Sequence, residues 1–453
     1  MRLNEVAKAV NGKLVGEDVV ITGVSTDTRA LQKGDLFVAL RGPHFDGHQF
    51  LNEALLSKAV GALIDQSTET DLSTVHVLDA KKALGQLAAH WRAKFDIPVI
   101  GVTGSNGKTT VKEMIGAILS VKSETLVTVE NLNNEIGVPL TLLRLRDAHR
   151  YAVIEMGTNH IGEIRHLSRI THPTVALITN AAPAHLEGLR NMEIVAEAKA
   201  EIFDGLDDNG VAVINADDPF ASFWRQRAAP RRCLSFALHH DADVTAEYTL
   251  EANAVRLQVC TAQGDVDVLL SLPGMHNVAN ALAAICAVLA VGVDLEQVKN
   301  GLETITPIAG RLQKRRGTRG ATVYDDTYNA NPASIRVAID VLSPNTGPKL
   351  LVLGDMAELG EQQLALHHEI GLYARECGID AIYALGPLSE ETVRAFGKGA
   401  VHFKTRGALI KRLSDELSKD TTVLVKGSRF MHMEGIVSAV VEENDDPSGG
   451  SIH

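Results

Sequence analysis

The sequence predicts an α/β protein of three domains, of which the second and third are built on parallel sheets. A chain of 453 residues corresponds to roughly three domains of about 150 residues each. Short apolar runs alternate with amphipathic stretches over residues 96–310, and again over 311–442. This alternation predicts parallel strands with flanking helices. A glycine-rich bend in the first of these regions joins an expected strand to an expected helix.

The composition is that of an ordinary globular protein with ample core material. Hydrophobic residues make up 45% of the chain and charged residues 22%. A net charge of −12 argues against a general binder of nucleic acid or of anionic membranes. The four cysteines form no C-x-x-C motif, which favours a reducing compartment and no structural zinc. With no signal peptide and no apolar run long enough to span a bilayer, we expect a cytoplasmic protein without membrane insertion or a nucleic-acid partner.

Residues 1–95 mix short strand-like runs with helical stretches and are expected to form a small N-terminal α/β domain. The expected strands are 35–40, 62–65 and 75–78, and a helix is expected over 80–94. The polar segment near residue 25 contains Thr26, Asp27 and Arg29. These side chains could hold a polar ligand, but a solvated turn is the simpler interpretation on physical grounds.

The expected central domain, residues 96–310, contains P-V-I-G-V-T-G-S-N-G-K-T-T at 98–110. The apolar run 98–102 predicts a buried strand, and apolar residues over 111–119 recur at helical spacing. Glycines let backbone N–H groups approach phosphates, and a helix N-terminus is electropositive. Lys108 can reach the β- and γ-phosphates of a nucleoside triphosphate, and the Thr109 hydroxyl can bind Mg²⁺. The expected nucleotide-binding residues here are Gly104, Ser105, Asn106, Gly107, Lys108, Thr109 and Thr110.

The loop departs at one position from the usual G-x-x-x-x-G-K-[ST] pattern. Val102 stands where that pattern has glycine, and the nearest glycine is Gly101. A chance glycine loop is the alternative. The combination of strand, loop, Lys-Thr and amphipathic helix disfavours it.

Strands expected at 151–155, 174–180 and 211–215 bring polar residues to one edge of the central sheet. Glu155 ends the first of these strands, Asn180 ends the second, and His185 follows. Glu155 is a plausible Mg²⁺ ligand, because magnesium prefers hard oxygen donors. His185 is a weaker candidate on chemistry alone, because imidazole is not the usual magnesium ligand, and a structural histidine is the alternative.

Lys199 is the most unusual residue of the helix expected over 192–206. It lies on the apolar stripe that contains Val195 and Ile202, where a lysine is costly unless it is paired. Burial also lowers the pKa of a lysine amine. A side chain that extends to the edge and keeps its charge in water is the alternative, and it is slightly favoured on these grounds.

Further polar candidates lie in the rest of the chain. Asn277 is near the start of the apolar helix expected over 273–290, where it can cap the helix or touch a ligand base. The third domain, 311–442, is expected to be Rossmann-like, with strands at 321–325, 349–353, 380–385 and 422–426 and helices at 334–342, 361–377 and 431–441. Its strand ends carry D-D-T-Y-N-A-N-P, L-G-D-M-A-E-L-G and K-G-S-R, a candidate site at the carboxyl edge. The acidic tail, 443–453, is expected to be disordered.

Taken together, these stretches resemble the Mur ligases, the ATP-dependent amide-bond ligases of bacterial cell-wall synthesis. The resemblance covers the chain up to about residue 440, and the displaced first glycine is normal for this family. Its marks are T-G-S-N-G-K-T, Glu155, N-A-A-P-A-H-L-E at 180–187, the Lys199 helix, H-N-V-A-N at 276–280, and Gly310 followed by Arg311. The segments 131–139, 325–332 and 352–360 resemble the branch that joins D-alanyl-D-alanine to a UDP-N-acetylmuramoyl-tripeptide (UDP-MurNAc-tripeptide).

The resemblance implies a set of cofactors and site residues. The cofactors are ATP and Mg²⁺, with two ions expected, and Lys199 is implied to be carbamylated by CO₂. The metal-site residues are Thr109, Glu155, His185 and Lys199, and the catalytic residues are Lys108, Lys199, His185 and Arg311. Asn277, Arg311 and Asp326 are implied nucleotide contacts. Thr26, Asp27 and Arg29 are implied to hold the UDP-sugar, and Asn133, Asn134, Asn329 and Asn331 to contact substrate.

The implied reaction transfers the γ-phosphoryl group of ATP to a substrate carboxylate, and the acyl phosphate is then attacked by the dipeptide amine. We expect a monomer whose third domain closes over the nucleotide. Folylpolyglutamate synthetase and cyanophycin-type ligases share the phosphate loop, but the segments 26–29 and 325–332 speak against them. A Mur ligase that adds the third peptide residue is the nearest rival. A phosphotransferase with a stable phosphorylated product and an inactive nucleotide-sugar-binding protein are alternatives of other classes.

Overall fold

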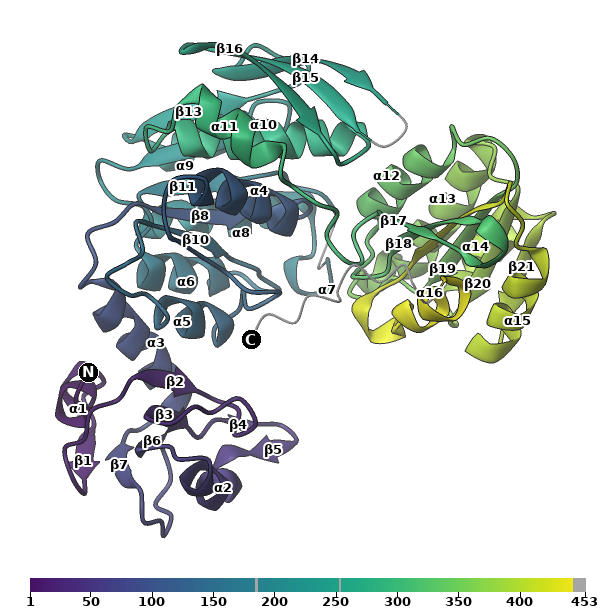
Figure 1. Cartoon of the computed structure of the whole chain (residues 1–453). Coiled ribbons are helices and arrows are strands. Elements are labelled where there is room, and N and C mark those ends of the chain that lie inside the picture. Colours follow the sequence, from purple (N-terminus) through teal and green to yellow (C-terminus); the bar gives the residue numbers. More distant parts are fainter. Residues whose placement is uncertain (184–185, 252–253, 443–453) are drawn as a thin grey trace.

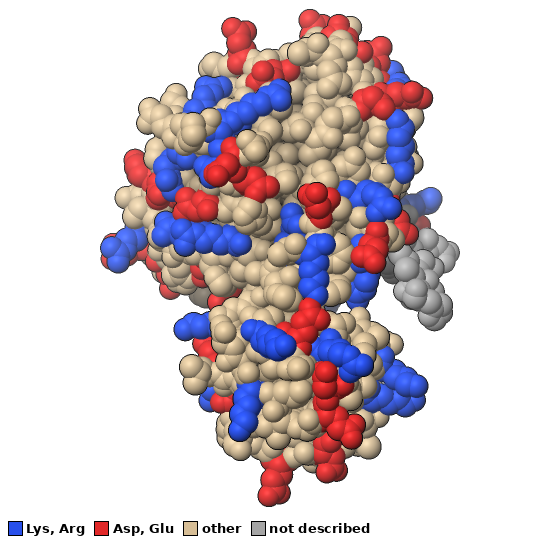
Figure 2. Space-filling view, turned by 90° about the vertical axis from the view of Figure 1, so that its left-hand side faces the viewer, with Lys and Arg blue, Asp and Glu red and all other residues tan. Residues whose placement is uncertain are grey.

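Three large sheets organise the protein in the computed structural model, which describes residues 1–183, 186–251 and 254–442. Figure 1 shows the N-terminal sheet below the central sheet, and the third sheet to one side of the central one. Within the described residues, no helix is both long and apolar enough to cross a membrane. Figure 2 shows positive and negative side chains interspersed over one face of the molecule.

The N-terminal sheet has the strand order β1-β7-β6-β3-β2, in which only β1 is antiparallel to its neighbour. The strands expected at 35–40, 62–65 and 75–78 correspond to β3 (Asp35–Val38), β6 (Gly61–Ile64) and β7 (Ser73–His76). The remaining elements are α1 (Leu3–Ala9), β1 (Lys13–Val15), β2 (Gly23–Ser25), β4 (Arg41–Gly42), β5 (Phe45–Asp46), η1 (Gly47–Phe50) and α2 (Leu51–Leu56). Every residue of β3 and β6 is buried, so these two strands form the centre of this sheet.

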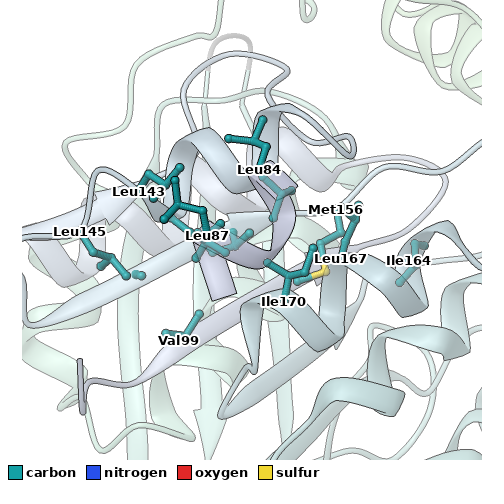
Figure 3. Close-up of a cluster of buried hydrophobic side chains, with 14 of the residues drawn as sticks. Leu84, Leu87, Val99, Leu143, Leu145, Met156, Ile164, Leu167 and Ile170 are labelled. Atoms are coloured by element: carbon teal, nitrogen blue, oxygen red, sulfur yellow. The ribbon is translucent and has the colours of Figure 1, made fainter. Parts of the chain in front are cut away.

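Helix α3 (Ala80–Arg92) joins the N-terminal sheet to the central part of the protein. Its Asp79 cap accepts a hydrogen bond from the backbone N–H of Lys82, 3.0 Å away. Leu84 and Leu87 share one buried cluster with Leu167 and Ile170 of the central part, as Figure 3 shows. The expected helix 80–94 therefore forms, and its apolar face packs on α5 (Gly137–Leu142) and α6 (Glu163–Thr171).

The central sheet has nine strands in the order β16-β15-β14-β13-β12-β11-β8-β10-β9. Its parallel part contains β8 (Val99–Thr103), β9 (Thr125–Val127), β10 (Tyr151–Glu155), β11 (Val175–Ile178), β12 (Val211–Asn215) and β13 (Arg232–Phe236). The strands expected at 98–102, 151–155, 174–180 and 211–215 are all present. Alternate residues of β8 face opposite sides, so that Val99 enters one apolar cluster and Ile100 the other.

The sheet continues into an antiparallel extension that the sequence analysis did not predict. It consists of β14 (Val244–Leu250), β15 (Val255–Thr261) and β16 (Gly264–Leu270). Along β15, Val255, Leu257 and Val259 are buried, and the residues between them are exposed. This period of two is the signal of a strand with one solvated face, and it was not used in the prediction.

Helices cover both faces of the central sheet. The second apolar cluster includes residues of α4 (Lys108–Ser120), α10 (Met275–Leu289) and α11 (Leu295–Leu302). The first includes residues of α3, α5, α6, α8 (Met192–Ala200) and α9 (Ala221–Ala228). The helix expected over 192–206 ends as an α-helix at Ala200 and continues as the 3₁₀ turn η2 (Glu201–Gly205). A short helix, α7 (Leu186–Leu189), precedes α8.

The third sheet has the order β17-β18-β22-β19-β20-β21, parallel except for β17. Its strands are β17 (Gln313–Arg316), β18 (Thr322–Asp326), β19 (Lys349–Gly354), β20 (Ala381–Leu385), β21 (Ala400–Phe403) and β22 (Thr422–Lys426). The flanking helices are α12 (Pro332–Leu342), α13 (Gln363–Glu376), α14 (Ser389–Phe396), α15 (Arg406–Glu416) and α16 (Glu434–Val440), with 3₁₀ turns η3 (Thr318–Gly320), η4 (Gly360–Gln362) and η5 (Arg429–Met431). The expected helix 431–441 starts later, because η5 and the left-handed His432 precede it.

Candidate active site

The loop between β8 and α4 is shaped by close approaches that only glycine permits. Gly107 has φ +81°, and a Cβ there would lie within 2.3 Å of Asn280 Oδ1. A Cβ at Gly104 would collide with the Thr179 hydroxyl. The two glycines therefore let the loop lie against β11 and α10 at the start of α4.

Asn180, the second residue after β11, holds this loop in place. The expected strand 174–180 is therefore shorter at its carboxyl end. Its backbone carbonyl accepts from the N–H of Ser105 (3.0 Å), and its Oδ1 accepts from the N–H of Asn106 (3.0 Å). Thr179 Oγ1 donates to the Asn106 carbonyl at 2.6 Å. The carboxyl end of the neighbouring strand thus fixes the loop conformation before any ligand binds.

Lys108, Thr109 and Glu155 lie together at this edge of the sheet. Lys108 Nζ donates to the Gly104 carbonyl at 2.7 Å, and burial lowers the pKa of its amine although Glu155 lies nearby. Thr109 Oγ1 donates to Glu155 Oε2 at 2.9 Å. Asn133 Nδ2 donates to the other carboxylate oxygen at 2.8 Å. A cation, a hydroxyl and a buried carboxylate therefore share one small polar site.

Lys199 of α8 is buried behind this site, with 1% of its surface exposed. The interpretation in which its side chain extends to the edge and stays in water is therefore wrong. Burial is the main cause that lowers its pKa well below the ordinary value, and the charge of nearby Lys108 lowers it further. Glu163 and Glu201 act in the opposite direction. The amine is therefore much more readily neutral than that of an exposed lysine.

Two side chains from the third part of the chain reach the phosphate loop. Arg311 donates to Thr109 Oγ1 at 2.8 Å, and its guanidinium lies 4.1 Å from the ring centre of Tyr328. Asn331 Nδ2 donates to Asn106 Oδ1 at 2.9 Å, while its Oδ1 caps the start of α12. Central loop and third sheet are thus joined by direct hydrogen bonds.

The segment that carries Arg311 is itself held by a buried ion pair. Asp326 Oδ2 lies 2.6 Å from Lys426 Nζ, and Asp326 Oδ1 accepts from the backbone N–H of Leu312. Lys426 also donates to the Asn329 carbonyl at 2.8 Å. The sequence predicted polar strand ends at 325–332 and 426–429. The Asp326–Lys426 ion pair between them was not predicted, because it depends on the contact between β18 and β22. Tyr328, which stacks on Arg311, was also missed within its motif.

These groups surround a cavity of about 940 Å³. The predicted site residues that line it are Ser105, Asn106, Gly107, Lys108, Thr109, Thr110, Asn133, Asn134, Glu155, Asn277, Arg311, Asp326, Asn329 and Asn331. His276 also lines it, and burial lowers the pKa of its imidazole to about 4. Asn277 Nδ2 donates to the Pro273 carbonyl instead of capping α10.

Other predicted site residues do not line this cavity. Gly104 and the buried Lys199 are not among its lining residues. Thr26, Asp27 and Arg29 lie in the N-terminal part, where Asp27 and Arg29 form an exposed ion pair at 2.7 Å. His185 and the tail 443–453 fall outside the described residues.

Comparison with known proteins agrees with this arrangement. Three family models match consecutive stretches: "Mur ligase family, catalytic domain" at 20–92, "Mur ligase middle domain" at 102–288, and "Mur ligase, glutamate ligase domain" at 310–429. The chain is 42% identical to the UDP-N-acetylmuramoyl-tripeptide–D-alanyl-D-alanine ligase of Escherichia coli (strain K12) over 444 residues, which are 97% of this chain and 98% of that protein. The chain belongs to the Mur ligase family.

Other members of the family match this Mur ligase over nearly the whole chain. The enzyme of the same name from Bacillus subtilis (strain 168) is 35% identical, over 97% of this chain and 98% of that protein. A crystal structure of MurF from Acinetobacter baumannii superposes with a TM-score of 0.90 at 36% identity, covering 96% of this chain and 97% of that one. MurF of Thermotoga maritima in complex with ADP gives 0.83 at 28% identity, covering 94% and 98%.

Proposed function

We propose that this Mur ligase joins D-alanyl-D-alanine to a UDP-MurNAc-tripeptide with ATP, giving UDP-MurNAc-pentapeptide, ADP and phosphate for peptidoglycan synthesis. The observation that carries the proposal is one cavity lined by the phosphate loop 105–110 and also by Arg311 and Asn331 from the third part. The relatives from E. coli and B. subtilis are named for this reaction, and the T. maritima structure contains ADP.

The chemistry explains why ATP is required. A carboxylate is a poor electrophile, so an amine does not attack it at a useful rate at neutral pH. In the proposed reaction a carboxylate oxygen of the tripeptide forms a bond to the γ-phosphorus, and ADP leaves. The dipeptide amine then attacks the carbonyl carbon, the C–O bond to phosphate breaks, and the amine loses a proton to solvent.

The residues of the cavity support this chemistry mainly by position and charge. Lys108 projects from the loop where phosphates would lie, and its ammonium offsets their negative charge. Arg311 adds a second cation from the third part, held by Tyr328 and by the Asp326–Lys426 pair. Asn180 keeps the loop N–H groups aligned. Preorganised donors of this kind act more strongly in a partly closed cavity than in water.

The donor set also fits a magnesium ion. The Thr109 hydroxyl and the Glu155 carboxylate are hard oxygens whose Oγ1 and Oε2 atoms are 2.9 Å apart. Thr109 and Glu155 would hold Mg²⁺, which when bound neutralises phosphate charge. The described residues contain no cluster of three or more His, Cys, Asp or Glu that could hold a metal. From the family resemblance, we propose that Lys199 and His185 serve the second expected ion.

The burial of Lys199 supports its proposed carbamylation. A neutral amine adds to CO₂ with formation of an N–C bond and loss of one proton, and the low pKa of Lys199 favours the neutral form. The product is a carbamate, whose single negative charge is shared by two oxygens close to the charge of Lys108. Such oxygens are suitable ligands for a hard cation.

We further propose the remaining roles. Residues 1–95, 96–310 and 311–442 act as UDP-sugar-binding, ATP-binding and ligase domains, with Thr26, Asp27 and Arg29 at the UDP-sugar. Asn277 and Asp326 contact the nucleotide, and the amides of Asn133, Asn134, Asn329 and Asn331 contact the peptide substrates. We also propose a monomer that acts in the cytoplasm, where ATP is available.

An acceptor screen tests this function. The enzyme is given ATP, Mg²⁺ and a UDP-MurNAc-tripeptide with either D-alanyl-D-alanine or a single amino acid, and phosphate and UDP-linked products are measured. We expect phosphate only with the dipeptide. Phosphate release with a UDP-MurNAc-dipeptide and a diamino acid would assign the enzyme to the preceding step. A stable phosphorylated product formed without any amine would instead indicate a phosphotransferase.

A further inference from the structure

Lys112 is a completely buried lysine for which the proposed reaction has no use. It lies on α4 one turn after Lys108, and 0% of its surface is exposed. Its Nζ donates to the Thr128 carbonyl at 2.6 Å and lies 2.8 Å from Glu113 Oε1. A buried ammonium loses its hydration, so these two partners must offset a substantial cost.

Thr128 connects this lysine to the proposed magnesium site. It follows β9 directly, and its N–H donates to the Val153 carbonyl at 3.0 Å. Its Oγ1 accepts from the backbone N–H of Glu155 at 3.0 Å. Thr128 therefore accepts a hydrogen bond from Lys112 through its carbonyl and from the Glu155 N–H through its hydroxyl. The Glu155 carboxylate is the group that faces Thr109.

The segment after Thr128 closes over the same carboxylate. Asn133 donates from Nδ2 to Glu155 Oε1, and its carbonyl accepts from the N–H of Gly157 at 2.8 Å. Asn131, Asn133 and Asn134 all line the cavity. The 129–136 segment thus contacts Glu155 through Asn133, and it begins next to Thr128, the residue that Lys112 binds.

We propose that Lys112 is a positioning residue, which fixes Thr128 and so sets Glu155 and the 129–136 segment opposite Thr109. The ammonium connects α4, which carries Lys108 and Thr109, to Thr128 after β9. Thr128 in turn binds the backbone of Glu155 at the end of β10. Two elements that must present oxygens to one cation are thereby held at a fixed separation. This inference rests on the proposed function, because it assigns Glu155 and Thr109 to Mg²⁺.

The test is Lys112→Met, which removes the charge and the donors but keeps an unbranched side chain. We expect kcat to fall by about 10- to 100-fold and the Mg²⁺ concentration for half-maximal activity to rise by a similar factor, as for other residues that orient metal ligands. Calorimetric titration should show weaker ADP binding with Mg²⁺ present and ADP binding within about twofold of wild type without it. Lys122→Met is the matched control, because Lys122 lies just after α4 and pairs with Asp294 at the surface.

A second control separates positioning from loss of stability. Ile115 is equally buried on α4 and is part of the second apolar cluster, so Ile115→Val should lower the melting temperature without changing the Mg²⁺ dependence. Thr128→Val, which removes the Glu155 N–H acceptor, should change the Mg²⁺ dependence in the same direction as Lys112→Met. If Lys112→Met does not fold, the Mg²⁺ dependence of Thr128→Val tests the proposal.

The inference is rejected if either variant folds with wild-type kcat and Mg²⁺ dependence. It is also rejected if neither variant folds, since Lys112 would then serve stability alone. Absence of product with the wild-type enzyme would overturn the proposed function itself, and the two failures are therefore distinguishable.

Discussion

The central and third sheets have the same parallel architecture but use their carboxyl edges differently. At the central edge, Lys108 and Thr109 line the cavity together with Glu155. At the third edge, Asp326 pairs with Lys426, and Asp355 accepts hydrogen bonds from the backbone N–H groups of Leu388 and Ser389. In the proposed site, the central edge therefore supplies the charges that face the phosphates, whereas these two carboxylates of the third edge hold loops of the protein.

A polar side chain at the end of a strand therefore does not by itself indicate a ligand contact. Asp326 lines the cavity, yet both of its oxygens are used within the protein, by Lys426 and Leu312. In addition to the proposed nucleotide contact, Asp326 therefore acts on the site through Arg311, the neighbour of Leu312. Substitutions at the central edge should therefore act on turnover, and those at the third edge first on stability.

The largest expected effect is at Lys108. Lys108→Ala removes the loop cation that neutralises transferring phosphate, so we expect kcat to fall by about 10³-fold or more. The free energy of unfolding should change little, because the substitution removes both the cost of burying the ammonium and its hydrogen bond to the Gly104 carbonyl. Phosphate release measures the first quantity and urea unfolding the second. Near-wild-type turnover would contradict the assignment, and the surface variant Lys299→Ala serves as control.

Lys199→Ala should come next, with a loss of about 10²-fold or more in kcat if its carbamate contributes to charge neutralisation. A short-chain carboxylic acid added to the assay should restore part of the activity, because it supplies the missing anionic oxygens. The wild-type enzyme should lose activity in CO₂-free buffer. Full activity of Lys199→Ala under CO₂-free conditions would exclude the carbamate role.

Lys426→Met tests the expected effect of the third edge on stability. It leaves Asp326 buried without its cation, which typically costs about 3–5 kcal/mol of unfolding free energy. Chemical denaturation would show this loss. Any reduction in kcat should be smaller than that of Lys108→Ala, because Lys426 acts on Arg311 through Asp326 and on the 329–331 segment through the Asn329 carbonyl. A variant with wild-type stability would show that the pair does not organise this edge.

The smallest effect concerns His276, whose folded pKa of about 4 lies below its ordinary value because of burial. Between pH 6.5 and 4 the unfolded chain therefore binds more protons than the native protein at this position, and stability falls as the pH falls. His276→Gln should remove about 2 kcal/mol of this acid destabilisation between pH 7 and pH 4.5. Unfolding measured at pH 7 and pH 4.5 tests this: an unchanged difference between the two pH values would contradict it.

Much of the fold followed from local patterns, and the exceptions have physical causes. The strands at 151–155, 211–215 and 422–426 have the predicted bounds, because they are short apolar runs that end at polar residues. The β14–β16 extension was not predicted, although buried and exposed residues alternate along β15 as they do in a strand with one solvated face.

The phosphate loop was predictable because its residues are adjacent in the sequence. The roles of Lys426 and Tyr328 were not, since they depend on contacts between distant segments. Local sequence likewise could not decide whether Lys199 is buried, because that depends on how α8 packs on its neighbours.

The most direct test of the account follows the oxygen atoms of the substrate. A UDP-MurNAc-tripeptide labelled with ¹⁸O in the carboxylate that receives the dipeptide is incubated with ATP, Mg²⁺ and D-alanyl-D-alanine, and the released phosphate is analysed by mass spectrometry. If the γ-phosphoryl group is transferred to that carboxylate, each phosphate carries one ¹⁸O atom. Unlabelled phosphate accompanying amide formation would contradict the central claim.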